Sequence, residues 1–214
     1  MRAVVMSFVV VFCCFVPLTP PPVPIVVSGL EAHAWLMNEH LLGHEPHLLQ
    51  TLVVPSRGTE SAVFVVDDAA PRVVARRAVH NIWAAVSLER HAGKLRPRRH
   101  MRMALSALPD VPIAVEHCEA PIDVVTVQHL LARWREVVRR PRQHLDAGDL
   151  GLRDGTRWDF SMHADGVHET REAHSPSASS MDGRLVAVSD ALAALACAPE
   201  AQRAAALRAL EQVL

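Results

Sequence analysis

Apolar side chains recur at every third or fourth position from Asp123 to Arg140, and this spacing constrains the fold more than any other feature. The pattern is typical of a helix with one apolar side, and Pro141 ends it. Such a helix is stable in water only when another element covers its apolar side. We therefore expect a helix packed on a core through Val124, Val127, Leu131, Trp134 and Val138.

A second amphipathic helix is predicted between Pro71 and Gly93. Two aspartates precede Pro71, which is a common start signal, and Gly93 is a common stop signal. Apolar residues within this range follow helical spacing, so Trp83 is expected in the core together with Trp134. The residues that form this apolar side are Val74, Val79, Ile82, Trp83 and Val86.

Short strands are predicted before the first of these helices along the chain and between the two. The β-branched runs Gln50–Val54 and Ser61–Val66 are separated by loop residues, which favours two neighbouring strands. Val111–Val115 contains Pro112 and is expected to be an irregular or edge strand. A short helix is expected over Ala34–Leu42, where Gly43 ends it.

The C-terminal third predicts a β-hairpin followed by helices. Apolar and polar residues alternate from Trp158 to Met162, and the dipeptide Asp165-Gly166 is typical of a hairpin turn. One helix is expected across Leu185–Leu195, and Pro199 begins a last one. We therefore predict a single α+β domain over residues 34–214, in which short antiparallel strands pack with two amphipathic helices and 150–214 form a hairpin-helix subunit.

Residues 150–197 resemble a module of uncharacterised actinobacterial proteins. The resemblance rests on Asp154-Gly155-Thr156-Arg157-Trp158, on the Asp165-Gly166 turn, on Ser175-Pro176 and on a helix that begins near Asp182. No activity is assigned to that module. The resemblance therefore implies a hairpin and a helix, and no catalytic residues.

The N-terminal residues 1–33 have the features of a signal peptide or a membrane anchor. Arg2 precedes an apolar run over Ala3–Val16, which a proline-rich segment ends. Ala32-His33-Ala34 has the small-x-small form of a cleavage site. These features predict an exported or membrane-anchored bacterial protein; the alternatives are a cytoplasmic protein with a buried strand here, or a misassigned start.

Four cysteines without CxxC spacing give no zinc framework. Removal of residues 1–33 would leave only Cys118 and Cys197, which form one disulfide in an exported protein or remain buried thiols in the cytosol. Cys118 follows His117, but neighbours on an extended chain point to opposite sides, so this pair is not expected to act as a nucleophile and its base.

Thirteen histidines supply the candidate metal ligands. On a helix, His40 and His44 would lie one turn apart on one face, and His47 could add a third ligand for zinc or another transition metal. The alternative is a solvated or hydrogen-bonded histidine cluster. His163, His168 and His174 belong to the predicted hairpin, and we interpret them as a solvated polar face because no cysteine or paired carboxylate accompanies them.

Charge is unevenly distributed along the chain. Residues 71–102 hold nine Lys or Arg against one Glu, whereas residues 143–214 hold six basic and eleven acidic residues. The basic segment suits a polyanion such as nucleic acid or an anionic membrane, a protein surface, or the acidic C-terminal part of the same chain, which we favour. The arginines that would bind a polyanion are Arg72, Arg76, Arg77, Arg96, Arg98, Arg99 and Arg102.

Recognised catalytic motifs are missing from the sequence. It holds no P-loop, dinucleotide-binding glycine pattern, GxSxG motif or EF-hand loop. We therefore predict a non-catalytic binding or structural module without a cofactor. The sequence does not identify its partner. The alternatives are a histidine-based metal protein or metalloenzyme, and a polyanion-binding protein.

Overall fold

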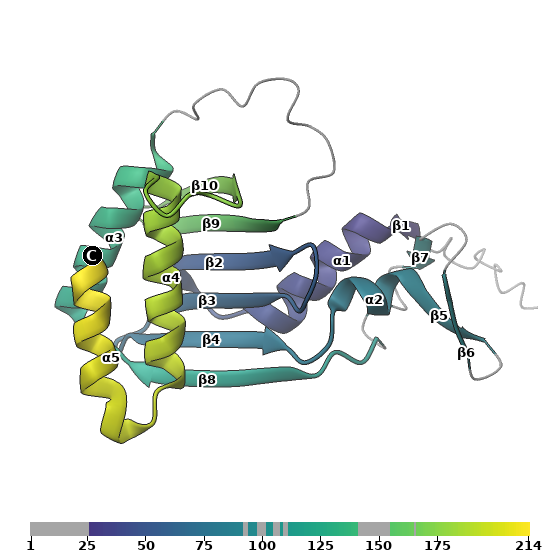
Figure 1. Cartoon of the computed structure of the whole chain (residues 1–214), viewed down its shortest axis with the longest axis horizontal. Coiled ribbons are helices and arrows are strands. Elements are labelled where there is room, and N and C mark those ends of the chain that lie inside the picture. The colour runs from purple at the N-terminus through teal and green to yellow at the C-terminus, as the bar shows by residue number, and fades with distance from the viewer. Residues whose placement is uncertain are drawn as a thin grey trace, which may run out of the picture.

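The chain forms one six-stranded antiparallel sheet with helices packed on both of its faces (Figure 1). The computed structural model describes residues 26–91, 94–97, 102–104, 108, 111–140, 155–164 and 166–214. The α+β class predicted from the sequence is confirmed. The strand order is β10-β9-β2-β3-β4-β8, with β2 (His47–Pro55), β3 (Ser61–Val66), β4 (Arg72–Ala78), β8 (Val115–Pro121), β9 (Thr156–Ala164) and β10 (Val167–His174).

Two helical layers cover the sheet, and side chains alternate between its two faces. One face, here called the α4 face, packs against two C-terminal helices, and the other, the α1 face, packs against the N-terminal helices. The α4 face meets α3 (Val124–Val138) and α4 (Met181–Cys197), and α5 (Glu200–Val213) packs on α4. The α1 face meets α1 (Gly29–Met37), the π-helix η1 (Asn38–Leu42) and α2 (Ile82–Ser87).

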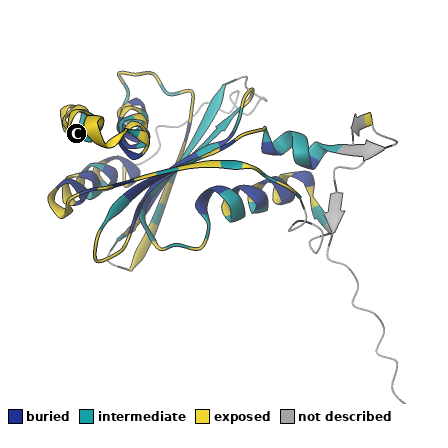
Figure 2. Ribbon diagram, turned by 90° about the horizontal axis from the view of Figure 1, so that it is seen from below, coloured by how far each residue is buried: buried dark blue, intermediate teal, exposed yellow. Residues whose placement is uncertain are grey.

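Each face has its own core, and Figure 2 shows the buried residues on the inner sides of the helices. Trp134 of α3 and Phe160 of β9 meet edge to face on the α4 face, with ring centroids 6.3 Å apart. Phe64 of β3 is the large aromatic side chain buried on the α1 face. Short pairs lie outside the main sheet: β1 (Val26–Ser28) with β7 (Arg102–Ala104), and β5 (Leu88–His91) with β6 (Lys94–Pro97).

Several predicted elements are confirmed. Helix α3 begins after Asp123, whose carboxylate accepts the backbone N–H of Thr126 as an N-cap. The hairpin forms with Gly166 in its turn at φ 73°, where a residue without a Cβ is favoured. Gly43 follows η1 at φ 72° and ends the first helical segment, which starts at Gly29 rather than Ala34. The apolar side predicted for α4 is fully buried at Leu185, Val188, Leu192 and Leu195.

The helix predicted between Pro71 and Gly93 is wrong. Residues Arg72–Ala78 form β4, and only Ile82–Ser87 are helical. Strand β4 lies between β3 and β8 and is covered on both faces, so Val73, Val74 and Ala75 are all buried. A strand buried on both faces loses the alternation that distinguishes it from a helix, and this is why the spacing misled.

Two further predictions need correction. Trp134 is fully buried as expected, but Trp83 is only half-buried, because it belongs to the short α2 and not to a long helix facing the core. Val111–Ala114 form no strand, and the edge strand starts at Val115.

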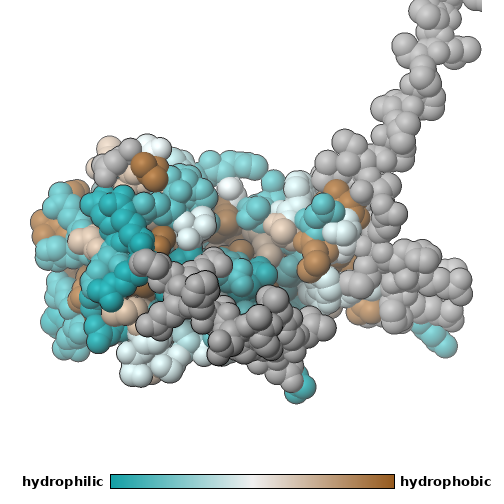
Figure 3. Space-filling view, turned by 90° about the horizontal axis from the view of Figure 1, so that it is seen from above, coloured by the Kyte–Doolittle hydropathy of each residue, from teal (hydrophilic) through white to brown (hydrophobic). Residues whose placement is uncertain are grey.

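The N-terminal prediction lies largely outside the described residues, which begin at Val26. Within them, Ala32 and His33 are buried parts of α1, so the folded structure includes residues on both sides of the predicted cleavage site. Among the described residues, no helix combines the length and the apolar character that a membrane span requires. Figure 3 shows mostly hydrophilic described surface on the side of the molecule seen from above.

Candidate functional site

The predicted histidine ligands His40, His44 and His47 do not form a metal site. His40 belongs to η1, which ends at Leu42, so His44 is not one helical turn further along the same helix. The side chain of His44 is 85% exposed and pairs with Glu39 at 3.3 Å. Within the described ranges, no three His, Cys, Asp or Glu side chains are grouped so that they could hold a metal ion.

His47 instead is a half-buried side chain that packs against the core residue Phe64. Its ring lies 4.2 Å from the ring of Phe64, and its Nδ1 shares a 3.0 Å hydrogen bond with Oε1 of Gln50. Burial lowers the pKa of His47, against the opposing effects of Gln50 and Glu45. This environment favours a neutral imidazole with a packing role.

Three arginines of the predicted polyanion site lie on β4, and they point to both sides of the sheet. Arg72 and Arg76 are on the α1 face, where each bonds a different oxygen of Glu45, at 2.8 and 2.9 Å. Arg72 also pairs with Asp68 and Glu119. These acidic partners all precede residue 143. The sequence-based prediction that the acidic residues 143–214 would bind the basic segment is therefore wrong for Arg72 and Arg76.

Arg77 does not belong to that surface. Arg77 is on the α4 face and donates to the hydroxyl of Thr59 at 3.2 Å. Arg96 and Arg102 belong to β6 and β7, and Arg98 and Arg99 lie outside the described residues.

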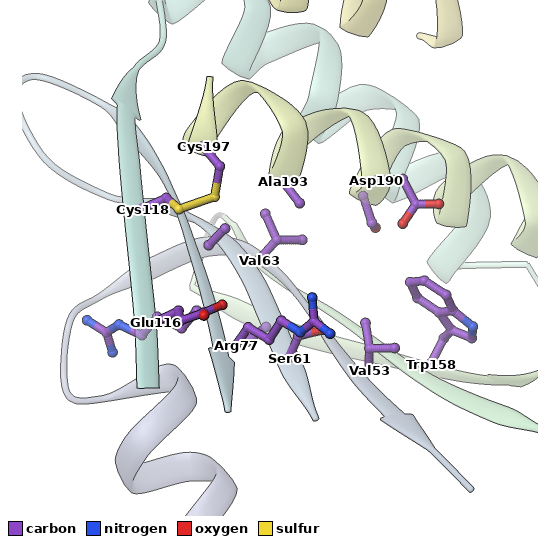
Figure 4. A pocket seen from close by; sticks show the side chains of 14 residues that line it. Val53, Ser61, Val63, Arg77, Glu116, Cys118, Trp158, Asp190, Ala193 and Cys197 are labelled. Carbon is purple, nitrogen blue, oxygen red and sulfur yellow. A yellow bond between two sulfur atoms is a disulfide. The ribbon is translucent and has the colours of Figure 1, made fainter. Parts of the chain in front are cut away.

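The best candidate site is a pocket on the α4 face. Helix α4 crosses the sheet near one end of its strands, and the strands continue beyond the helix (Figure 1). The pocket has a volume of about 370 Å³ and lies between α4 and this open part of the sheet (Figure 4). A volume of this size is in the range of small-molecule sites, which is roughly 300–1,000 Å³.

The floor of the pocket is mainly apolar and comes from four adjacent strands. Val53, Val63 and Ala75 line it from β2, β3 and β4, and Trp158 lines it from β9. The Trp158 indole is stacked at 14° on the Phe160 ring, with centroids 6.4 Å apart. The core therefore supports the position of the indole.

A buried hydroxyl pair holds α4 over this floor. Ser189 donates to the carbonyl oxygen of Leu185 at 2.8 Å, so its oxygen is free to accept the hydroxyl of Thr51 at 2.7 Å. Thr51 is two residues from Val53, and Val53 pairs with Trp158 across the sheet. This register brings Ser189 and the adjacent Asp190 to the part of the sheet that carries Trp158.

The charged side chains of the pocket differ in whether they have a partner of opposite charge. At one side, Arg77 is the cross-strand partner of Glu116, so a positive and a negative side chain share that part of the wall. Elsewhere, Asp190 has no ion pair or hydrogen bond with any described residue; the residue is exposed, but partial desolvation of its carboxyl raises the pKa. Figure 4 shows the Asp190 carboxylate and the Trp158 indole toward the same end of the pocket.

A disulfide forms another part of the wall. Cys118 of the edge strand β8 is bonded to Cys197 at the end of α4 (Figure 4). The pairing left open by the sequence is therefore present, and Cys118 has no free thiol to act as a nucleophile. His117 points to the opposite face, where it accepts a hydrogen bond from Arg76, as expected for neighbours on a strand.

Comparison with known proteins adds no assignment. Neither the protein-family models, nor the curated proteins, nor the solved structures gave a match to this chain. The site is consequently judged on its own geometry.

Sequence reasoning did not single out Asp190 as a site residue. It lies within the predicted helix Leu185–Leu195, next to the buried Ser189, but it is itself exposed and its spacing does not distinguish it from a solvated carboxylate. Only the packing of α4 on the sheet brings it into the same pocket as Trp158.

Proposed function

We propose that this protein is a non-catalytic binding module whose pocket accepts an alkylammonium group. The observation that carries the proposal is the carboxylate of Asp190, which has no cationic partner among the described residues and lies above an apolar floor that ends in Trp158. An indole face attracts a cation, and a partly desolvated carboxylate adds a stronger attraction. Val53, Val63 and Ala75 would cover the apolar part of the ligand.

The ligand could be a free organic cation or a lysine side chain of a peptide, which share this chemistry. Titration of the full chain with benzyltrimethylammonium by isothermal calorimetry tests the first source, and titration with N-acetyl-lysine amide tests the second. Benzenesulfonate is the matched anion. Saturable binding of a cation and none of the anion is expected; equal binding of both, or binding of neither cation, would overturn the proposal.

Two variants locate the ammonium group. Asp190→Asn and Trp158→Phe should each weaken cation binding by roughly five- to thirtyfold, since a cation–π contact and the attraction between an ammonium group and a carboxylate are each worth about 1–2 kcal/mol. Glu116→Gln is the matched control, because it removes a carboxylate from the same pocket at the side where Arg77 offsets its charge. A loss of affinity as large in Glu116→Gln would show that the ligand responds to overall charge and not to Asp190.

We also propose that this is an exported bacterial protein, with residues 150–197 related to the actinobacterial hairpin-helix module. The Cys118–Cys197 disulfide supports export, since disulfides persist mainly in oxidising compartments. The hairpin followed by α4 agrees with the order of elements in that module. Mass spectrometry of the protein from its native cells tests export: removal of a leader that ends before the folded α1, and an oxidised cysteine pair, are expected, and an intact N-terminus with free thiols would contradict it.

A further inference from the structure

A second feature lies away from this pocket, on the β9–β10 hairpin. His163 of β9 and His168 of β10 are direct cross-strand partners, and both side chains are exposed on the α1 face of the sheet. Their ring centroids are 4.0 Å apart, and the ring planes are inclined by 34°. Neither imidazole has a hydrogen bond or an ion pair with another described residue, so all four ring nitrogens remain available.

Two imidazoles held this close suit a transition metal better than two separate histidines do. A metal–imidazole bond is about 2.0–2.1 Å long, so small side-chain rotations bring one nitrogen of each ring to a common ion. The hairpin already holds the two ligands together before any ion binds. Burial and the neighbouring His163 both lower the pKa of His168, which favours the neutral, metal-binding form.

The surroundings also favour a cation. His168 lines a cleft of about 320 Å³ between the hairpin and η1, and the carboxylates of Asp159 and Glu172 line the same cleft. Asp159 is already paired with Arg157 at 3.1 Å, which leaves Glu172 as the carboxylate that contributes a net negative charge. Arg171 of β10 is bonded to Asp182 of α4. The cleft leaves space for water molecules to complete the coordination of an ion.

We propose that His163 and His168 form a two-imidazole site for a divalent transition metal, with water in the remaining positions. Copper(II) should bind most tightly, followed by nickel(II), because affinities at nitrogen sites rise in that order. The site involves none of the residues predicted as ligands from the sequence, and it is independent of the pocket beside Asp190. Its ligands come from two strands, so the ion would link the two arms of the hairpin.

The test is a titration of the full, untagged chain with copper(II) and nickel(II) by isothermal calorimetry at pH 7.5. One site per chain is expected, and binding should weaken by about tenfold or more, or about 1.4 kcal/mol, in either His163→Asn or His168→Asn. His174→Asn is the matched control: it is exposed on the same strand and the same face, but its cross-strand partner is Arg157. This control should bind as the wild type does.

A structural readout separates this site from binding at other histidines. Copper should raise the melting temperature of the wild type and of His174→Asn, but not of the two site variants, since an ion bound only to the folded hairpin stabilises it. Copper affinity that is unchanged in His163→Asn and His168→Asn would overturn the proposal. So would the absence of one-to-one binding in the wild type.

Discussion

Individual buried polar residues fix helices to this sheet. Glu60, which is 1% exposed, accepts hydrogen bonds from His33 of α1 and from the backbone N–H groups of Ile82 and Trp83, at 2.8, 2.8 and 3.2 Å. Burial alone would raise the pKa of Glu60, but these donors together lower it below its ordinary value. One carboxylate thus connects α1 to the start of α2.

Glu60→Gln should lower the free energy of unfolding at pH 7 by about 1–3 kcal/mol, because an amide nitrogen would face a donor in place of an acceptor oxygen. The lowered pKa means that the stabilisation is complete above the ordinary carboxyl pKa and is lost as the pH falls through the lowered one. Urea unfolding at pH 7 and at pH 3 measures this. A difference between wild type and variant that stays constant over this range would contradict the assignment.

The pKa of Asp190 is shifted in the opposite direction from that of Glu60. Its raised pKa means that the folded state disfavours the charged carboxylate, so Asp190→Asn should increase stability at pH 8. The gain should shrink as the pH falls below the ordinary carboxyl pKa, where both folded and unfolded chains hold the proton. Thermal unfolding at pH 8 and pH 3.5 checks this, and a variant less stable than wild type at pH 8 would contradict it.

Trp134 shows how much one core side chain contributes to the free energy of unfolding. The side chain is fully buried, and its indole N–H meets no acceptor among the described residues. Trp134→Ala should lower the free energy of unfolding by about 3–5 kcal/mol through the cavity that it leaves. Trp134→Phe should cost much less, because it keeps most of the ring and removes an unsatisfied donor. Equal losses in urea unfolding of the two variants would show that the indole is not packed as described.

At the scale of elements, α4 contains one position where glycine is more favourable than alanine, against the usual order of helix propensities. Gly183 lies in its first turn, and a Cβ at this position would overlap the backbone carbonyl of Ser177. Gly183→Ala should therefore destabilise the protein, although alanine normally favours a helix by about 1 kcal/mol. The exposed Ala194 is the control, and Ala194→Gly should cost about that amount. Chemical denaturation measures both; a gain in stability from Gly183→Ala would contradict the close approach.

At the scale of the whole molecule, the disulfide joins the edge of the sheet to the C-terminal helices across 79 residues. The variant with both Cys118→Ser and Cys197→Ser should lose about 4 kcal/mol, because closing a long loop restricts the unfolded chain. A thiol reductant should destabilise the wild type similarly and leave the double variant unchanged. Reduction that does not alter the unfolding midpoint of the wild type would contradict a stabilising bridge.

The sequence by itself determined the elements with strong local signals. Helix α3 has a capping aspartate and one apolar side, the hairpin has alternating strands around a glycine turn, and α4 keeps Leu185, Val188, Leu192 and Leu195 on one side. These signals depend on neighbours within a few positions. Local periodicity and backbone preference therefore suffice to predict them.

Tertiary structure alone decided the central strand and the sites. Residues Arg72–Ala78 form a strand because β3 and β8 hydrogen-bond to them on both sides and helices cover both faces of the sheet. The local spacing of apolar residues contains no information about these neighbours. Asp190 and Trp158 line one pocket only because α4 packs on the sheet, and the predicted hairpin brings His163 to His168 only in the register that the folded strands adopt. Burial and electrostatic environment arise from residues distant in sequence, so these properties appear only once the chain is folded.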